Sequence, residues 1–468
     1  MKSIHFFKGL SWLIILNMLV KPIWLFFIDR QVQLLVGYQE YGRYFAILNL
    51  SYVLFFLSDI GISNMLNQRM ANHLPLNLMQ LLRIKVVLLV IYFIVFSFIG
   101  WLTKISQWNI LFYVIAIQAL TSLLIFFRNV ITGNQYFGTD AWVSVMDKSL
   151  MIVLCGSILY TSFFGGMSLL LFLRVQALCT LIAVLVSFLF IVRKRLVTVS
   201  GNENIETILK FVTPFAVITL LMSVHYRLDG FLLERIHLNG PMEAGIYASA
   251  YRLLDASNMV GYLASSFLVA FVARNLKERD SLQDAIFNTR HLLMFCSLGV
   301  VSFVIMFAPW VEHALYHTDR DYNCRVIQLC MASYPAYCLV HIYGSVLTGS
   351  ARFREFISIL IVSVLLNIIL NIVFIPRMGA LGCCIAALAS QYFCGIAVMI
   401  ATNRSLQISY QAKSIAIYLS FAALLILFFY ITRNAINVWI ILSIAAVGSL
   451  FVLTTQLTFF KKYFISLR

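Results

Sequence analysis

Charged residues are scarce in this sequence of 468 residues. Only 11% are Asp, Glu, Lys or Arg, while 62% are hydrophobic, and the mean hydropathy is +0.93. A soluble globular chain has about 25% charged and roughly 45–50% apolar residues, and no soluble fold hides this much apolar surface. The composition therefore predicts an all-α membrane protein, for which lipid is much of the solvent.

Long polar linkers are also missing, and the apolar runs are continuous instead of alternating, which excludes a β-barrel. Runs of about twenty residues each cross a bilayer once. No small-x-small cleavage site follows the first run, which is expected to stay as a span. About fourteen spans are expected, at 9–34, 43–65, 84–103, 109–132, 141–161, 167–192, 211–235, 244–272, 291–311, 326–349, 355–375, 380–402, 413–432 and 436–459.

Familiar catalytic motifs do not occur. There is no Walker A sequence, no HExxH motif and no nucleophile elbow. The nine cysteines follow no metal-binding or disulfide spacing, and all except Cys324 fall inside apolar runs. We therefore expect a protein that is not an enzyme and that holds no metal or cofactor. Cys324 is expected in a polar outer loop that a membrane-impermeant thiol reagent reaches.

The net charge of +16 has no soluble basic domain to carry it, so nucleic acid is not an expected partner. Membrane orientation and an anionic substrate are the remaining explanations. With the N-terminus inside, about 21 of the Lys and Arg residues fall in segments on that side and about 8 on the other. This bias predicts a multi-pass protein of the cytoplasmic membrane, with both termini cytoplasmic and an even number of spans.

Short sequence similarities recur along the chain. The segment 132–137 (TGNQYF) resembles 348–353 (TGSARF), 216 positions later, and Gly166 and Gly382 share that offset. The segment 41–44 (YGRY) also resembles 244–247 (AGIY). Chance is the alternative for matches this short. A true repeat predicts that spans four to six superpose on spans ten to twelve through a rotation about an axis near the membrane normal, with substrate bound between the halves.

The repeat divides the chain into three parts. We expect an N-terminal lobe of six spans over 1–195, a C-terminal lobe of six spans over 196–402, and two additional spans over 403–468. The two lobes are expected to be related by a parallel pseudo-two-fold axis.

Several charged residues lie inside the predicted spans. A charge at the bilayer centre costs about 2.5–3.5 kcal/mol on insertion scales, so such side chains face the bundle interior or a water-filled cavity. An interior lined with cations suits an anionic head group such as a diphosphate. Structural ion pairs between helices are the alternative. The basic residues are Lys21, Lys148, Arg174, Arg227 and Arg252, and the acids are Asp59, Asp147, Asp229 and Asp255.

Substrate binding is assigned chiefly to Arg227 and Arg252. Arg252 shares a helix face with Asp255, three residues later, as His225 does with Asp229. Asp229 and Asp255 are predicted to moderate the attraction for substrate by competing for the arginines, which makes them gating or coupling residues.

The remaining charged positions have supporting roles in this hypothesis. Lys21, Lys148 and Arg174 are expected to complete a ladder of cations across the membrane. Arg174, Arg227 and Arg252 then lie in the outer half, Lys21 near the middle and Lys148 further inward. Asp59 is a candidate for binding a proton or Na⁺, with helix capping or ion pairing as its alternative.

Together these features resemble a known group. The segments 41–44 (YGRY) and 59–62 (DIGI), followed by Arg69, and the later segment 244–248 with Tyr251-Arg252, are similar to the O-antigen and capsular polysaccharide flippases. That family belongs to the multidrug/oligosaccharidyl-lipid/polysaccharide exporter (MOP) superfamily. The likeness in span count and spacing covers nearly the whole chain.

The resemblance implies a function. Such proteins move undecaprenyl-diphosphate-linked oligosaccharide repeat units from the inner to the outer leaflet of the cell inner membrane. They work by alternating access between two six-helix lobes around a cationic cavity, for the synthesis of O-antigen of lipopolysaccharide, capsule or exopolysaccharide. The implied partners are the lipid-linked substrate, membrane lipids, the polysaccharide polymerase machinery and a coupling ion, either a proton or Na⁺.

Two other functions stay open at this point. A cation-coupled multidrug exporter of the same superfamily usually has twelve spans and an acid-lined site. A membrane enzyme such as an O-antigen polymerase or ligase usually carries a large outer loop, whereas the longest outer loop expected here, 312–325, is short. Fourteen spans and interior cations favour the flippase.

Overall fold

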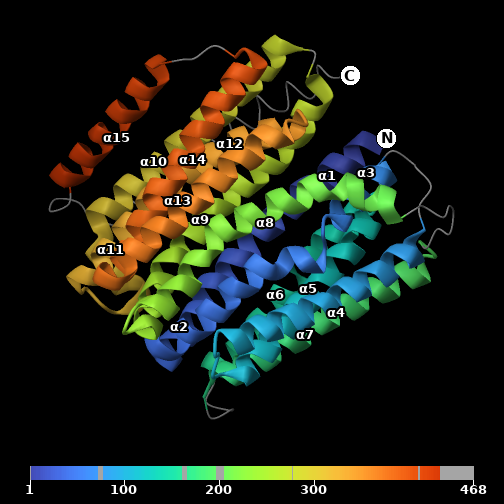
Figure 1. The fold of residues 1–468 in the computed structure, drawn as a ribbon, viewed down its shortest axis with the longest axis horizontal. Helices are drawn as coiled ribbons and strands as arrows, with labels where there is room; N and C mark the ends of the chain where they lie inside the picture. Colours follow the sequence, from blue (N-terminus) through green and yellow to red (C-terminus); the bar gives the residue numbers. More distant parts are fainter. Residues whose placement is uncertain are drawn as a thin grey trace.

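The computed structural model describes residues 2–71, 77–160, 166–196, 205–276, 278–408 and 412–432, and the described elements are helical apart from short turns (Figure 1). They are α1 (Lys2–Ile23), the π-helical segment η1 (Trp24–Asp29), α2 (Arg30–Leu54), the 3₁₀ segment η2 (Phe55–Ser58), α3 (Ile62–Ala71), α4 (Leu78–Leu102), α5 (Trp108–Gly133), α6 (Phe137–Tyr160), α7 (Leu169–Arg193), α8 (Ile205–Ile236), α9 (Gly240–Asn275), α10 (Arg279–Tyr316), α11 (Asp321–Ala332), α12 (Tyr334–Gly349), α13 (Phe353–Met378), α14 (Ala380–Leu406) and α15 (Ala412–Thr432).

Twelve helical stretches in the described part of the chain are long and apolar enough to cross a membrane. The first, Trp12–Ser58, makes two crossings because its backbone leaves the helix at Gly37 (φ 82°, ψ 163°). Tyr41 Oη donates a hydrogen bond to Asp29 Oδ2 at 2.8 Å. Twelve residues of continuous helix would separate these residues by about 18 Å, so the chain turns back at Gly37. The span expected at 436–459 lies outside the described residues, and the count of fourteen stays a prediction.

Two expected spans are interrupted. The helix of 43–65 changes to η2, and Ile60 and Gly61 then take positive φ values of 44° and 81° before α3 begins. The span of 326–349 consists of α11 and α12, which meet at Ser333, with a proline in the first turn of α12. Because proline lacks a backbone N–H and fixes its own φ, it is favoured at the start of a helix, where its missing N–H breaks no helical hydrogen bond.

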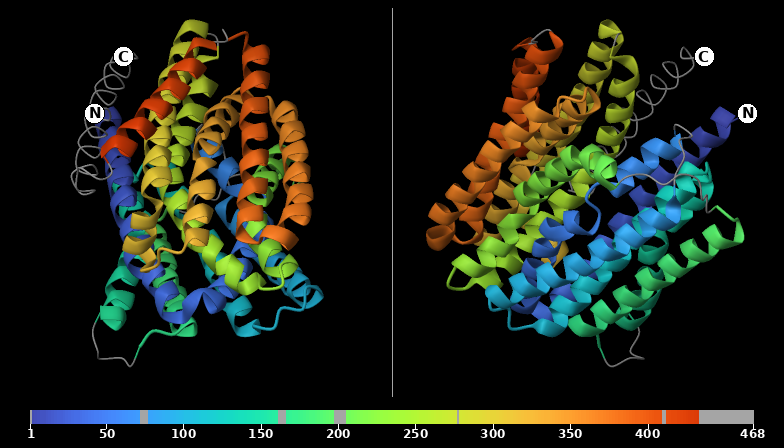
Figure 2. Two further views of the ribbon diagram at one scale, coloured as in Figure 1. Left: turned by 90° about the vertical axis from the view of Figure 1, so that its left-hand side faces the viewer. Right: turned by 45° about the vertical axis from the view of Figure 1, so that its right-hand side comes forward.

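The two halves of the chain repeat the same packing. In the first half α1 packs on α6, and α5 and α6 pack on α7. In the second half α8 packs on α13, and α12 and α13 pack on α14. Helix α2 joins the halves through contacts with both α8 and α9, and α15 packs on α10 at the edge of the bundle. The ribbons of the two halves converge at the end away from the N-terminus and splay apart toward it (Figure 2). The lobe boundaries predicted at 195 and 402 stay a prediction.

The turns of the predicted repeat have the same conformation. Helices α5 and α12 end at Gly133 and Gly349, and the residues two positions later, Gln135 and Ala351, have φ values of 66° and 57°. The backbone hydrogen bonds across the two turns correspond one to one at the offset of 216. The superposition of whole span triplets stays a prediction.

One predicted correspondence of the repeat, between Gly166 and Gly382, is wrong. Gly166 has a positive φ of 104° ahead of α7, whereas Gly382 lies within α14. The residue with positive φ that precedes α14 is Gly379 (φ 55°). The shared offset of Gly166 and Gly382 therefore does not reflect equivalent positions.

The two YGRY-like segments pack against each other where α2 crosses α9. A Cβ atom at Gly42 would lie 1.9 Å from the carbonyl oxygen of Pro241, and one at Gly245 would lie 2.0 Å from that of Tyr38. Side chains larger than hydrogen do not fit at such distances, so both glycines are needed for the backbones to approach this closely. The resemblance between the segments thus marks a contact between the two halves.

Other sequence expectations need correction. Cys324 lies in α11 and not in a loop, and it is only 6% exposed, so it is a poor target for a thiol reagent. Lys85 and Arg290 belong to the Lys and Arg residues that the charge count assigned to the inner side, but both are buried inside the bundle. Arg69 lies in α3, but its side chain is outside the described part of the chain. The orientation of the termini stays a prediction.

The crossing of α2 and α9 predicts a specific sensitivity to glycine replacement. Gly42→Ala should lower the unfolding free energy by about 1–3 kcal/mol, because the added methyl group meets backbone atoms that have no room to move. Gly156→Ala is the matched control, since its Cβ would make only an ordinary contact of 3.8 Å with Ile28 Cδ1. The measurement is the Tm of each purified variant in detergent. Equal values for the two variants would contradict the tight crossing.

Candidate functional site

A buried ion pair joins the two halves at the end where they converge. Arg252 Nη2 lies 2.8 Å from Asp29 Oδ2, and its Nε donates to the same oxygen at 2.9 Å. Arg252 Nη1 donates to Gln33 Oε1 and to Tyr316 Oη, both at 2.6 Å. Tyr41 Oη donates to Asp29 as well. These five residues, from η1, α2, α9 and α10, form what we call the closed-end network.

The closed-end network leaves Arg252 fully paired. Its side chain is 3% exposed and that of Asp29 7%, and the guanidinium lies over the Tyr41 ring. Arg252 therefore does not pair with Asp255 along α9, as the three-residue spacing suggested, and it is not open to a substrate in this conformation. Here the structural ion-pair alternative describes the residue better than the substrate site.

Asp29 is missing from the predicted acids, although it lies in the same apolar run as Lys21. A carboxylate inside such a run was the available signal, since an intramembrane acid needs a partner. Its partner is 223 residues away along the chain, and nothing in the local sequence names it.

Further hydrogen bonds between the halves lie at the same end. Gln33 Nε2 donates to the carbonyl of Gly245 at 2.9 Å, and Arg235 Nη1 donates to that of Thr103 at 2.9 Å. Arg30 Nη1 makes a longer contact of 3.5 Å with the carbonyl of Ala314. This end carries the α8–α9 and α10–α11 turns, and the charge distribution predicts that it faces outside. The described structure is thus held together at the predicted outer end.

A second ion pair lies deeper in the bundle. Arg227 Nη2 of α8 donates to both oxygens of Asp255 of α9, at 2.9 and 3.0 Å. The guanidinium carbon lies 4.8 Å from the Tyr52 ring centre and 5.0 Å from that of Tyr251. The side chains are 18% and 31% exposed, unlike those of the closed-end network. We call Arg227 and Asp255 the central pair.

The central pair has the properties of a binding site for an anion. It lies where α2 of the first half meets α8 and α9 of the second. A guanidinium presents two parallel donors that match a carboxylate or a phosphate. Asp255 is the more exposed partner. An incoming anion could therefore replace Asp255 while Arg227 keeps its contacts with Tyr52 and Tyr251.

Three bases and two acids gather in the first half. Lys148 lies 3.3 Å from Asp147 and 4.2 Å from the centre of the Trp24 ring. Arg128 pairs with Asp140 at 2.7 Å. Lys21 of α1 lies within electrostatic range of Arg128, Asp147 and Lys148. The structure therefore brings Lys21 and Lys148 together, and it adds Arg128.

Arg174 does not join these groups. It lies on an exposed position of α7, and its Nε donates to Tyr113 Oη at 3.3 Å. The cation ladder predicted from the sequence is thus divided. Lys21 and Lys148 lie in one cluster, Arg227 lies in the central pair, Arg252 lies in the closed-end network, and Arg174 lies apart.

Asp229 belongs to a buried polar cluster in the second half. Asn371 Nδ2 donates to Asp229 Oδ1 at 2.7 Å and to Asn367 Oδ1 at 3.0 Å. Asn367 and His225 both lie 3.2 Å from Ser390 Oγ. Within the described part of the chain Asp229 is 1% exposed and has no basic partner at salt-bridge distance.

Acceptor atoms in this cluster are left without donors. Asn371 Oδ1 is buried and has no hydrogen-bond partner among the described residues. Gln391, whose Nε2 donates to the carbonyl of His225 at 3.4 Å, has a buried Oε1 that lacks one as well. Carboxylate and amide oxygens around one uncompensated negative charge suit a small cation or a proton. The arrangement fits the coupling role predicted for Asp229, and it shows that Asp229 does not compete for Arg227.

Asp59 is paired and capping in the structure. Lys85 Nζ, from α4, forms an ion pair with Asp59 Oδ1. The same carboxylate accepts from Ser63 Oγ at 2.7 Å and from the Ser63 backbone N–H at 3.2 Å at the start of α3. The capping and pairing alternative therefore describes Asp59 in this conformation.

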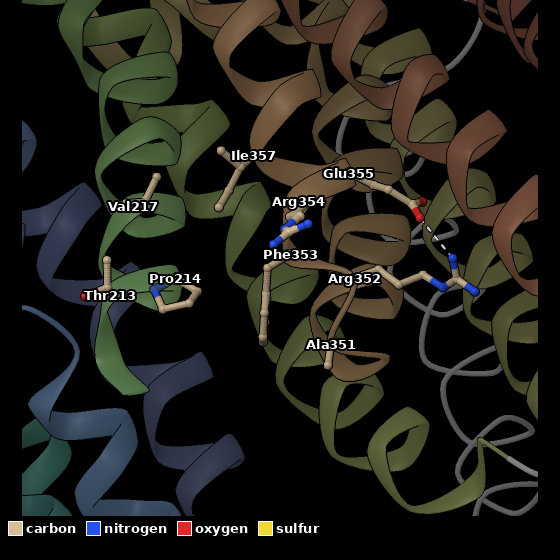
Figure 3. A pocket seen from close by; sticks show the side chains of 9 residues that line it. All are labelled: Thr213, Pro214, Val217, Ala351, Arg352, Phe353, Arg354, Glu355 and Ile357. Atoms are coloured by element: carbon tan, nitrogen blue, oxygen red, sulfur yellow. Dashed lines mark hydrogen bonds and ion pairs between the residues drawn. The ribbon is translucent and has the colours of Figure 1, made fainter. Parts of the chain in front are cut away.

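A pocket of about 530 Å³ opens at the other end of the second half, between α8 at residues 213–217 and the start of α13 (Figure 3). Pro214, Val217 and Phe353 line it, with Arg354 at its side and Arg352 paired to Glu355 at 2.9 Å. It contains none of the predicted site residues.

The Asp59–Lys85 pair predicts an asymmetric response to substitution. Lys85 is 0% exposed and Asp59 19%, so Asp59→Asn should cost about 3 kcal/mol by leaving a buried ammonium unpaired. Lys85→Met should cost less, and the double variant should recover most of the loss. Thermal unfolding of the purified variants measures this. A stable double variant without transport activity would instead support ion binding by Asp59.

No known protein-family model matches the sequence, and no curated protein matches it. Solved structures do resemble its fold. The lipid II flippase MurJ, in an inward closed conformation, matches with a TM-score of 0.68 at 13% identity and covers 99% of both chains. A MOP superfamily transporter from Pyrococcus furiosus matches with a TM-score of 0.60 at 15% identity, over 86% of this chain and 94% of the other.

A MATE transporter in complex with MaL6 matches with a TM-score of 0.58 at 15% identity, over 86% of this chain and 95% of that one. Identities this low establish the fold alone. The chain is therefore a multi-pass membrane protein with the fold shared by these MATE and MurJ structures.

Proposed function

We propose that the protein is a flippase that moves undecaprenyl-diphosphate-linked oligosaccharide repeat units across the cytoplasmic membrane for surface polysaccharide synthesis. The central pair carries this proposal. It places a partly exposed arginine between the two halves, beneath an end that is held closed. A guanidinium binds a phosphate group through parallel charge-assisted hydrogen bonds, and a diphosphate offers two such groups.

Alternating access follows from where the halves touch. The closed-end network and its neighbouring bonds join them at the predicted outer end, while the ribbons splay toward the other end (Figure 2). In this conformation a substrate enters from the inner side. Release outside requires the Asp29–Arg252 pair to separate, and an equivalent contact to form at the inner end.

The first-half cluster supplies a second attraction for an anion. Lys21, Arg128 and Lys148 exceed their two acid neighbours by one charge, and they lie on α1, α5 and α6. A diphosphate bound by both clusters would draw the halves toward each other. Its two phosphates give it an advantage over a singly charged anion.

The alternative of a cation-coupled multidrug exporter is less well supported. MATE structures align with 86% of this chain, whereas MurJ aligns with 99%. An interior arginine also attracts anions and repels cationic drugs.

Coupling is proposed for the polar cluster around Asp229. A proton or Na⁺ bound there would neutralise the buried carboxylate and offer a partner to the neighbouring Asn371 Oδ1, which lacks one. Because an unpaired buried charge is costly, such a cluster strongly favours the occupied state once it is closed to water.

The function is tested in a strain that lacks its own polysaccharide flippase. The chain should restore surface polysaccharide, and it should not raise resistance to cationic drugs in a strain without multidrug exporters. Restored drug resistance without polysaccharide would favour the exporter, and polymer formation by the purified protein would favour a polymerase or ligase.

Within that assay, Arg227 separates substrate binding from folding. Arg227→Ala should abolish polysaccharide export, and Arg227→Lys should keep part of it, since the charge stays but the bidentate geometry is lost. Arg404→Ala, at an exposed position near the inner end of α14, is the control and should export normally. Protein level is checked by blot. Full export by Arg227→Ala would reject the central pair as the substrate site.

Asp229 should control the energy source and not the affinity for substrate. In proteoliposomes, Asp229→Asn should make transport independent of an imposed proton or Na⁺ gradient while the purified variant still binds the lipid-linked substrate. The comparison uses a protonophore and a Na⁺ ionophore separately. Unchanged gradient dependence in the variant would place coupling elsewhere.

A further inference from the structure

Glu312, near the end of α10, is a buried carboxylate that the proposed mechanism does not use. It is 1% exposed. Asn323 of α11 lies beside it, yet neither carboxyl oxygen has a partner at hydrogen-bonding geometry within the described part of the chain. No salt bridge among the described residues includes it.

An ionised carboxylate is not stable in such a place. Burying a charge without a partner costs several kcal/mol or more, and the group takes up a proton instead. The described conformation is therefore one in which Glu312 is neutral. In a conformation that admits water to the same position, an ordinary carboxyl group, with a pKa of about 4.3, is ionised at neutral pH.

Glu312 lies next to the closed-end network, within electrostatic range of Tyr316. It lies one helical turn before Tyr316, whose hydroxyl accepts from Arg252 and donates to the carbonyl of Ser249 at 3.2 Å. Tyr38 of α2 is within electrostatic range of Glu312, and its buried hydroxyl also lacks a partner among the described residues. Glu312 thus lies where α10 meets the first half of the chain.

The ionisable groups around this position come from four elements. Tyr316 is on α10 itself, and Cys324 is on α11. Tyr38 on α2 faces Glu312, and Arg252 on α9 and Arg320 in the α10–α11 turn act on that tyrosine. The acids Asp319 and Asp321 lie near Cys324. In the described part of the chain, none of these places a cation against Glu312 in the closed conformation.

We infer that Glu312 is a proton-binding site whose occupation is coupled to closure of the predicted outer end. With its proton, Glu312 packs as a neutral group and the closed-end network stays intact. Without it, the carboxylate needs water or a cation, and both require α10 to move away from α2. This inference rests on the alternating access of the proposed function, and it adds the ligand that controls one of its steps.

The sign of the pH dependence follows directly. Opening releases one proton, so raising the pH favours the open end and lowering it favours the closed end. Between the pKa values of Glu312 in the two conformations, the ratio of open to closed protein should change tenfold per pH unit, as required for one proton. Outside that range the ratio should level off.

The test measures the opening itself. Spin labels are attached at Ser106→Cys in the α4–α5 turn and at Leu238→Cys in the α8–α9 turn, two exposed positions on opposite halves. They flank the Arg235–Thr103 contact, so the labels are close when the end is closed. Dipolar EPR on the purified protein in nanodiscs then follows the open fraction as the pH is varied. Protein without the two added cysteines corrects for labelling of the nine native ones.

Wild-type background should open with rising pH, up to tenfold per pH unit. Glu312→Gln, which keeps the shape of the neutral acid, should stay closed and lose the pH dependence. Asp319→Asn, an exposed acid in the neighbouring turn, should keep it. A distance distribution that does not change with pH in the wild-type background overturns the inference, even if Glu312→Gln does not fold.

The two proposals fail separately. Substrate-dependent opening at constant pH, without any pH effect, would keep alternating access and reject the role of Glu312. A pH response carried by Glu312 in a protein that does not restore surface polysaccharide would keep the proton site and reject the assigned substrate. Equal pH dependence in the wild-type background and in Glu312→Gln would assign the titration to another group and overturn the inference.

Discussion

The close crossing of α2 and α9 is the contact on which the rest of the molecule depends. Gly42 and Gly245 let the two backbones approach to distances that no Cβ atom would allow. Because of that approach, Asp29 and Arg252 meet across the halves and are shielded from water. The same crossing brings Tyr52 of α2 to the central pair on α8 and α9. The α2–α9 contact therefore both closes one end of the bundle and places Arg227 below that end.

Exposure and pairing separate the arginines that the sequence could not tell apart. Arg252 has three partners and is almost fully buried, whereas Arg227 has one carboxylate partner that is 31% exposed. Replacing the partner of a buried charge costs several kcal/mol, so Arg252 is suited to a step that happens once per cycle, when the end opens. Arg227 is suited to exchange its carboxylate for a phosphate, which costs much less because water already reaches the pair.

The uncompensated carboxylates lie in the second half, whereas the excess of cations lies in the first. Asp229 and Glu312 are both buried without a basic partner in the described part of the chain. Lys21, Arg128 and Lys148 share two acids. Such a division would let the second half respond to ions while the first half attracts the anionic substrate. The two functions would then meet at α2, which contacts both α8 and α9.

The sequence by itself determined the helical membrane fold, the approximate spans and the turns of the repeat. Each of these depends on local properties, namely the length of apolar runs, the positions of proline and glycine, and short matched segments. It also identified Arg227, Arg252 and Asp229 as charges that need an explanation.

Only the tertiary structure decided their partners, because Asp29 and Arg252 are 223 residues apart and Asp229 and Asn371 are 142 apart. Pairing between helices depends on which helix faces meet, and the hydropathy of a span does not predict which helix packs against it. The sequence does not single out Glu312 for the same reason. A carboxylate near the end of a span is ordinary, and only the packing of other helices removes both water and every partner from it.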